Sequence, residues 1–262
     1  MAHLERGGVR ISYEVFRGDS NDDNLPLLLT HGYGASAQMW DPNVGTLAAS
    51  RPVITWDLRG HGRSGCPADQ AEYTQAASVD DMAAVLDAAG ASRAVLGGLS
   101  LGGYLSLAFW LAYPARVAAL VLCDTGPGFR RDEARQRWND RAIATAARLE
   151  RDGLPALGDG PRPPDAAQWS PHGLALAARG MLTQHDARVI ESLPSIDVPA
   201  LVLVGADDKP FLGAAEYVAA KIPQARLVVI PKAGHMASAD QPELFNRHVL
   251  AFLGRTGQPA GR

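Results

Sequence analysis

A glycine-rich turn between a short apolar run and an apolar helix constrains the fold of this chain more than any other feature. Residues 94–96 form the apolar run, and the helix that follows the turn ends at Pro114. Ser100 lies at the centre of the turn, with Gly98 and Gly102 two residues to either side. In so tight a turn the strand and the helix press together, so side chains at both glycine positions would collide. We expect Ser100 to adopt a strained conformation that holds its hydroxyl clear of the sheet, the arrangement called a nucleophile elbow. A glycine-rich turn that merely contains a serine is the alternative.

Buried strands alternate with helices on both sides of this turn. Helices are expected from about residue 36, over 74–89, after residue 100, and over 213–221 and 242–253. Strands separated by helices in this way build a mostly parallel, doubly wound α/β sheet with helices on both faces. Apolar runs and alternation predict strand structure over 3–17, 25–30, 52–57, 94–96, 117–123, 199–205 and 226–230.

Residues 126–195 interrupt this alternation. They are rich in proline, arginine and alanine, and they contain two helical stretches, 132–151 and 171–192, around a Gly/Pro loop at 158–164. We therefore expect an α/β core formed by residues 1–125 and 196–254, with a helical cap inserted over 126–195 after the sixth strand. The polar residues 255–262 are expected to be a disordered tail.

Composition and charge limit the classes of partner that the protein is expected to bind. The 262 residues are 47% hydrophobic and 20% charged, enough for one large domain with an insertion. A formal net charge of -3 without a Lys/Arg cluster argues against nucleic acid as a partner, and no apolar run is long enough to span a membrane. Cys66 and Cys123 form no disulfide framework, and no His/Cys spacing suggests a metal. Because the N-terminus lacks the apolar core of a signal peptide, we expect a cytoplasmic protein.

His235 is the best placed of the seven histidines to activate a serine. A serine hydroxyl is a weak nucleophile until a base takes its proton, and the base is usually a histidine held by a carboxylate. His235 follows the last predicted strand, on a loop at the same carboxyl edge of the sheet as Ser100. His31 and His61 lie in glycine-flanked loops, where hydrogen bonding to the turn is the expected role.

The carboxylate partner of this histidine is ambiguous. Asp207 and Asp208 come directly after the strand at 199–205, and Asp124 follows the strand at 117–123. All three therefore lie at the edge where Ser100 and His235 are expected. Asp207 and Asp208 are neighbours in the chain, so they cannot both face the histidine.

Four short motifs give the chain a resemblance to the α/β-hydrolase superfamily, over about residues 10–253. In similar proteins the acid lies three residues after the glycine that ends its strand, which implies a triad of Ser100, Asp208 and His235. Some relatives place the acid where this chain has Asp124. The resemblance also implies an oxyanion hole made by the backbone N–H groups of Leu101 and Tyr33. The motifs are His31-Gly32-Tyr33-Gly34, Asp57-x-Arg59-Gly60-His61-Gly62-x-Ser64, Gly98-x-Ser100-x-Gly102-Gly103 and Ala233-Gly234-His235.

The resemblance is to serine-nucleophile members of the esterase and lactonase type that carry a cap. It implies cleavage of a carboxylic ester or lactone of a small, partly apolar substrate through an acyl-enzyme, without a cofactor, by a monomer or small homo-oligomer. The cap would roof the site, although its aromatic residues could equally form its own core. The residues predicted to line the pocket are Trp40, Phe129, Trp138, Met181, Phe211 and Met236.

Three other functions are each suggested by part of the sequence. Carbon–carbon bond hydrolases of the meta-cleavage type share the plan, but they usually have tryptophan after the catalytic histidine, where this chain has Met236. A catalytically slow ligand receptor is the alternative outside the enzymes. Residues 60–65 also fit the dinucleotide fingerprint G-x-G-x-x-G, but Cys66-Pro67 follows in place of an opening helix.

Overall fold

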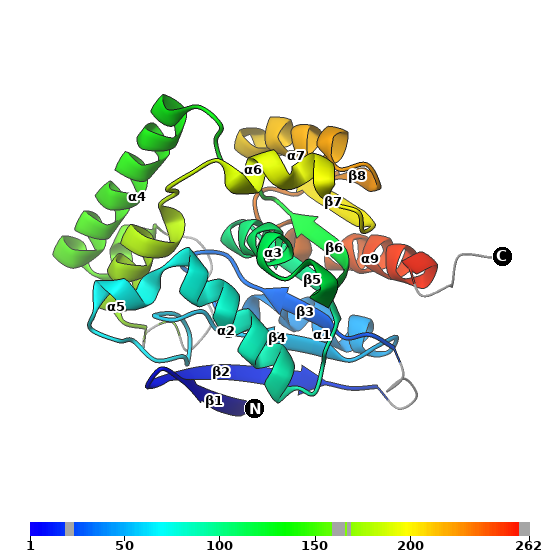
Figure 1. The fold of residues 1–262 in the computed structure, drawn as a ribbon, viewed down its shortest axis with the longest axis horizontal. Coiled ribbons are helices and arrows are strands. Elements are labelled where there is room, and N and C mark those ends of the chain that lie inside the picture. The colour runs from blue at the N-terminus through cyan, green and yellow to red at the C-terminus, as the bar shows by residue number, and fades with distance from the viewer. Residues whose placement is uncertain (19–23, 159–165, 167–168, 257–262) are drawn as a thin grey trace.

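Eight strands form one sheet in the described part of the chain, which comprises residues 1–18, 24–158, 166 and 169–256 of a computed structural model. The strand order is β1-β2-β4-β3-β5-β6-β7-β8 (Figure 1). β1 and β2 are antiparallel to each other and β2 to β4, whereas every other pair is parallel. The predicted mostly parallel α/β fold is confirmed. The strands are β1 (Ala2–Arg6), β2 (Val9–Phe16), β3 (Leu27–Thr30), β4 (Val53–Trp56), β5 (Ala94–Leu99), β6 (Val117–Cys123), β7 (Ala200–Gly205) and β8 (Ala225–Ile230).

Helices cover both faces of the sheet, which is why its central strands are apolar throughout. On β3, Leu28 packs into the core of one face, whereas Leu27 and Leu29 pack into the core of the other. The first face is covered by α2 (Gln75–Ala88), α3 (Leu101–Ala112) and α7 (Lys209–Lys221). The opposite face is covered by α1 (Asp41–Ala48), the short α8 (Ala237–Asp240) and α9 (Pro242–Thr256).

Two helix boundaries differ from the sequence prediction. α7 begins at Lys209 rather than at residue 213, because Pro210 suits the first turn of a helix. α9 continues to Thr256 rather than ending at residue 253, so the first two residues of the predicted tail, 255 and 256, are helical. Residues 257–262 and most of the predicted loop at 158–164 lie outside the described residues.

Residues 126–195, called here the helical segment, lie between β6 and β7. Their main helices are α4 (Asp132–Asp152), α5 (Pro171–Ala177) and α6 (Arg188–Ser192), and α4 and α5 lie beyond the arrowheads of the central strands (Figure 1). The segment has a small core of its own, which includes Leu149, Trp169 and Leu174. The position of α4 and α5 places the helical segment over the edge of the sheet at which β5, β6 and β7 end.

The predicted helix at 171–192 is broken. α5 passes into a π-helical turn, Ala178–Leu182, and α6 begins only at Arg188. A Cβ on Gly180 would overlap the carbonyl of Tyr73, so the turn is pressed against the core domain there. The Thr183 hydroxyl then donates to the Arg179 carbonyl at 2.6 Å and competes with continuation of the helix.

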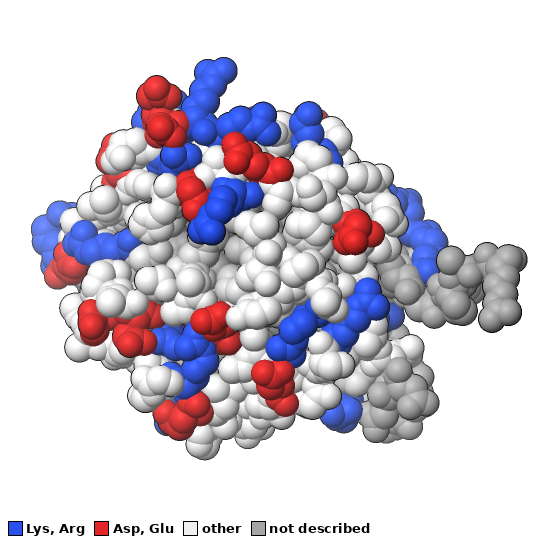
Figure 2. All heavy atoms as spheres, viewed as in Figure 1, with Lys and Arg blue, Asp and Glu red and all other residues white. Residues whose placement is uncertain are grey.

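Positive and negative side chains are interspersed on the molecular face shown in Figure 2, and neither sign forms a continuous patch there. Within the described ranges, no helix is both long enough and apolar enough to cross a bilayer.

Candidate active site

Ser100 occupies the predicted strained turn between β5 and α3. Its φ of 54° and ψ of -114° lie in a region that L-residues rarely adopt. A Cβ on Gly98 would overlap the backbone of Gly102, and a Cβ on Gly102 would overlap the carbonyl of Thr30. The two glycines thus let the strand, the turn and the helix approach closely enough to hold Ser100 in this conformation.

Hydrogen bonds to the end of β6 fix the turn further. The Ser100 N–H donates to the Cys123 carbonyl at 2.9 Å, and the Thr125 hydroxyl donates to the Ser100 carbonyl at 2.6 Å. Thr125 also packs against Gly103, where a Cβ would leave it no room. With its N–H and carbonyl both bonded in this way, Ser100 is held on both sides.

Asp208 and His235 form a hydrogen-bonded pair beside this turn. His235 Nδ1 lies 2.8 Å from Asp208 Oδ2, and the aspartate is buried whereas 40% of the histidine side chain is exposed. The two loops are joined directly, since the Asp207 N–H donates to the Ala233 carbonyl at 2.8 Å. The ring of Phe211, in the first turn of α7, lies 4.7 Å from the His235 ring.

Asp124 has a different set of partners, although it is fully buried at the same edge. Its carboxylate accepts hydrogen bonds from the N–H of Gly205 at 2.8 Å, the N–H of Ala237 at 3.2 Å and the thiol of Cys123 at 3.0 Å. Burial raises the pKa of Asp124 above its ordinary value. Asp207 is exposed, so of these aspartates it is Asp208 that holds His235 in the described structure.

The two backbone N–H groups assigned to an oxyanion hole flank the Ser100 turn. Leu101 is the first residue of α3, a position whose N–H has no partner within the helix. The Tyr33 N–H makes no hydrogen bond within the described residues, and Gly32 next to it lies against Leu99 and Ser100. The Tyr33 side chain points elsewhere, because its hydroxyl donates to the Leu174 carbonyl of the helical segment at 2.8 Å. Burial raises the Tyr33 pKa.

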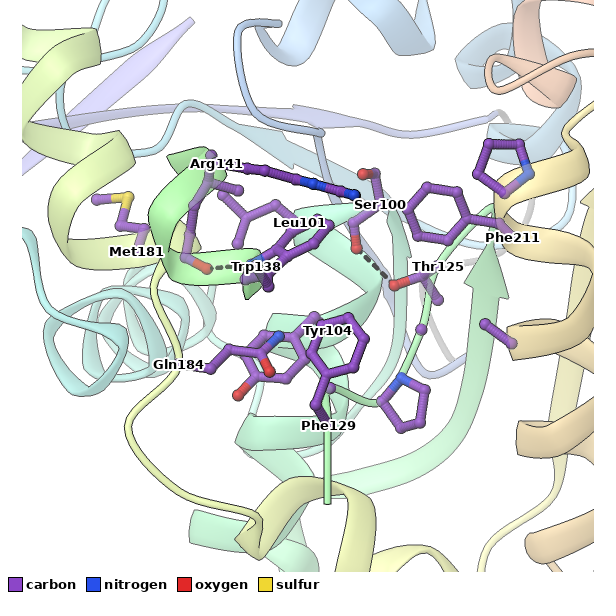
Figure 3. A pocket seen from close by; sticks show the side chains of 16 residues that line it. Ser100, Leu101, Tyr104, Thr125, Phe129, Trp138, Arg141, Met181, Gln184 and Phe211 are labelled. Carbon is purple, nitrogen blue, oxygen red and sulfur yellow. Dashed lines mark hydrogen bonds between the residues drawn. The ribbon is translucent and has the colours of Figure 1, made fainter. Parts of the chain in front are cut away.

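A cavity of about 320 Å³ opens at Ser100 between the sheet edge and the helical segment (Figure 3). Four of the residues predicted for a pocket line it: Phe129, Trp138, Met181 and Phe211. Trp138 is held by its indole N–H, which donates to the Leu182 carbonyl at 2.7 Å, and its ring lies 5.8 Å from that of Phe129. The walls are therefore mostly apolar and in part rigidly placed.

Trp40 and Met236 do not line this cavity, contrary to the sequence prediction. Trp40 ends a short 3-10 helix, Ala37–Trp40, and is fully buried, with its ring 6.1 Å from that of Phe245 on α9. Met236 packs into the same core, under α9 on the opposite side of the sheet from α3. Both residues are close in sequence to a predicted site loop, but that closeness does not determine the face of the sheet on which a side chain packs.

Four polar or aromatic residues of the lining were missed by sequence reasoning: Tyr104, Thr125, Arg141 and Gln184. Arg141 follows Trp138 by three residues on a helix, so the two share a face, and that spacing could have found it. Tyr104 stands four residues after Ser100 on α3 and was detectable in the same way. No local sequence pattern indicates that Thr125 or Gln184 would line the cavity.

The buried side chains of the motif at 57–64 form hydrogen bonds that stabilise the fold. Arg59 is buried and forms hydrogen bonds to Asp81 of α2 at 2.6 Å and 2.9 Å. The Asp57 carboxylate accepts from the N–H groups of Ala37 and Arg63 at 2.7 Å and 3.0 Å. No helix opens after Gly65 within the described residues up to Asp69, so the dinucleotide fingerprint lacks its helix N-terminus.

His31 and His61 hold turns, as expected. His31 Nε2 accepts from the Leu58 N–H at 3.0 Å, which leaves Nδ1 to donate to the Gly32 carbonyl at 2.7 Å. His61 Nδ1 lies 2.9 Å from the Arg59 carbonyl. In the ranges that the structure describes, no group of three His, Cys, Asp or Glu side chains is arranged to hold a metal ion.

Comparison with known proteins decides the family. The sequence model described as "Alpha/beta hydrolase family" matches residues 27–248. The chain belongs to this family. It is a hydrolase of the α/β fold, related to proteins with several different activities.

Two curated relatives and one solved structure illustrate that range. A Bacillus subtilis protein named "Putative 2-succinyl-6-hydroxy-2,4-cyclohexadiene-1-carboxylate synthase" is 32% identical over 244 residues, which is 85% of this chain and 88% of that protein. A Variovorax paradoxus protein named "Putative carbamate hydrolase RutD" is 32% identical over 90% of this chain and 94% of its own length. The solved structure of a thermophilic esterase from Thermogutta terrifontis, with malate bound, is 29% identical and covers 98% of this chain and 100% of that chain, with a TM-score of 0.80.

Proposed function

We propose that this protein hydrolyses a carboxylic ester or lactone by acyl transfer through Ser100. The observation that carries the proposal is the 2.8 Å hydrogen bond between Asp208 and His235, on joined loops beside the strained Ser100 turn. A serine on such a turn, a histidine and a buried carboxylate that orients it are the three groups that acyl transfer needs.

In the proposed reaction Asp208 holds the proton of His235 on Nδ1, which leaves Nε2 to act as base. Nε2 takes the Ser100 proton while Oγ forms a bond to the acyl carbon, and the same proton then passes to the leaving alkoxide as the ester bond breaks. Water next attacks the acyl-enzyme and gives a proton to Nε2. The bond between the acyl carbon and Ser100 Oγ then breaks, Nε2 returns that proton to Oγ, and the carboxylic acid leaves. No hydrogen bond joins Ser100 to His235 within the described residues, and such bonds commonly tighten only when substrate is bound.

The tetrahedral intermediate of this reaction carries a negative oxygen. The N–H groups of Tyr33 and Leu101 are the proposed donors to it, and both lack another protein partner in the described chain. Because these are backbone groups, substitution of either side chain leaves the donors in place.

The cavity favours a small, partly apolar substrate. Its volume of about 320 Å³ lies at the lower end of roughly 300–1,000 Å³ for ligand pockets. We infer that the helical segment acts as a cap that closes the cavity and supplies Trp138 and Met181 to its wall. The esterase relative from T. terrifontis supports ester hydrolysis, whereas the name of the B. subtilis relative points to a different reaction.

The first test is hydrolysis of 4-nitrophenyl esters from acetate to decanoate, by the wild type and by Ser100→Ala. We expect turnover with a chain-length optimum in the wild type, and a loss of about 10⁴–10⁶-fold in kcat for the variant. The variant should fold, because alanine replaces a residue of nearly the same size, and circular dichroism checks this. Hydrolysis that persists in folded Ser100→Ala protein would overturn the assignment of the nucleophile.

A fluorophosphonate probe separates two reasons for inactivity. If the probe labels Ser100 but no ester turns over, the nucleophile is active and simple esters are the wrong substrates, so lactones and vinylogous diketones follow. A protein that the probe does not label, but that retains a small ligand through purification, would be a binding protein and not a hydrolase.

A further inference from the structure

One charged side chain, that of Arg141 on α4, lies among the sixteen described residues that line the cavity. Every other lining residue is apolar, a glycine, or an uncharged Ser, Thr, Tyr or Gln. Figure 3 shows the Arg141 side chain stretched across the cavity, with its guanidinium directed toward Ser100. The residue is also exposed, so it lies where the cavity meets solvent.

Within the residues that the structure describes, no group of the protein holds the Arg141 side chain. Elsewhere on α4, Arg135 pairs with Asp132, and Glu150 pairs with Arg179 at 2.7 Å. Arg141 by contrast makes no hydrogen bond or ion pair within the described chain, and no acidic residue lines the cavity with it. The five N–H donors of this guanidinium therefore make no hydrogen bond to the described part of the protein, at the rim of a mostly apolar cavity.

A second lining group also lacks its partner. The side-chain oxygen Oε1 of Gln184 is buried without a hydrogen bond, and Gln184 as a whole is 7% exposed. Its backbone is fixed from α4: the Gln184 N–H donates to Asn139 Oδ1 at 2.8 Å, and Asn139 Nδ2 donates to the Gln184 carbonyl at 2.8 Å. The backbone that carries this unpaired acceptor is therefore fixed to α4, in the wall of the cavity.

We propose that the substrate is an ester or lactone that carries a carboxylate, which Arg141 binds, and a hydroxyl or N–H group that donates to Gln184. A carboxylate matches the guanidinium with two parallel, charge-assisted hydrogen bonds. This inference rests on the proposed function and adds the charge of the substrate to it.

Paired substrates of equal length test the charge. The half-ester 4-nitrophenyl hydrogen adipate carries a carboxylate at neutral pH, and methyl 4-nitrophenyl adipate is its neutral counterpart. We expect the wild type to prefer the half-ester. In Arg141→Gln the kcat/KM for the half-ester should fall about 10–100-fold, mainly through KM, while the neutral ester changes less than about twofold. Arg137→Gln, an exposed arginine of α4 outside the cavity lining, is the matched control and should keep the preference.

Binding without turnover separates this proposal from the proposed function. In Ser100→Ala protein, monomethyl adipate should bind more tightly than dimethyl adipate in calorimetry by about tenfold or more, and the added Arg141→Gln substitution should remove the difference. Equal affinity for both compounds, or an equal loss on both esters in Arg141→Gln, would overturn the role of Arg141. Absence of Ser100-dependent hydrolysis together with Arg141-dependent binding would instead overturn the hydrolytic function and leave a binding site for acidic ligands.

Discussion

Asp208 and Asp124 are both buried carboxylates at one edge of the sheet, and their hydrogen bonds indicate different roles. Asp208 contacts the His235 ring, whereas Asp124 joins the N–H of Gly205 to the N–H of Ala237. Gly205 precedes Asp208 by three residues, and Ala237 follows His235 by two. Asp124 is thus placed to position the loops that carry the proposed acid and base without touching either side chain.

This difference predicts unequal effects of the same substitution. Asp208→Asn should lower kcat by about 10⁴-fold, because the amide cannot hold the imidazole in the required tautomer. Asp124→Asn should lower kcat by about tenfold or less, and it should lower the free energy of unfolding by about 1–3 kcal/mol, because one of its oxygen acceptors becomes a donor facing another donor. Steady-state kinetics and urea unfolding of the two variants make the comparison. Near-normal activity of Asp208→Asn would transfer the proposed acid role to Asp124.

The position of a single residue was predictable from the sequence only where backbone geometry determines that position. Ser100 was found because its glycine neighbours leave few alternatives, and His235 because the strand before it ends at the same edge. The choice between Asp124 and Asp208 needed the φ of 45° at Asp124, which turns its carboxylate toward β7 and α8. Trp40 was misplaced because an aromatic near a loop gives no sign of the face on which it packs.

At the scale of elements, the elbow depends on close contact between backbones. Gly102→Ala would place a methyl group against the Thr30 and His31 carbonyls, which belong to the backbone and cannot move aside. We expect the free energy of unfolding to fall by about 3 kcal/mol or more, or the variant not to fold. Gly213→Ala is the control, since its Cβ meets nothing within 4 Å on the exposed side of α7, and it should stabilise by about 0.5–1 kcal/mol. Equal stability of both variants in urea unfolding would contradict this account of the turn.

Element type was more predictable than element boundaries. Apolar runs located all the central strands, because a strand buried on both faces tolerates little else. The break between α5 and α6 escaped prediction because its cause is distant in sequence: Gly180 is pressed against Tyr73. The helical segment as a whole was recognisable from composition, but which of its side chains turn inward to its own core, as Trp169 does, and which line the cavity depends on packing.

At the scale of the whole molecule, two buried histidines make stability sensitive to acid. His31 and His61 are buried side by side, with ring centroids 5.2 Å apart and the Tyr33 ring 5.5 Å from His61. Burial lowers the pKa of His31 to about 4 and that of His61 to about 3, and the charge of His31 adds to the shift at His61. In the unfolded chain both return to an ordinary value of 6.5. Between pH 6.5 and pH 4 the unfolded state therefore binds more protons, and stability falls as pH falls.

The expected loss at pH 5, relative to about pH 8, is about 2 kcal/mol for each histidine, or about 4 kcal/mol for the pair. Asp57 beside His61 acts in the opposite sense, because burial raises its pKa and the folded state then gains protons as the pH drops. Comparing variants cancels that contribution. In urea unfolding at both pH values, His61→Gln should lose about 2 kcal/mol less than the wild type does, whereas the exposed His172→Gln should match the wild type. A His61→Gln protein with the full wild-type loss would place the acid sensitivity outside this histidine pair.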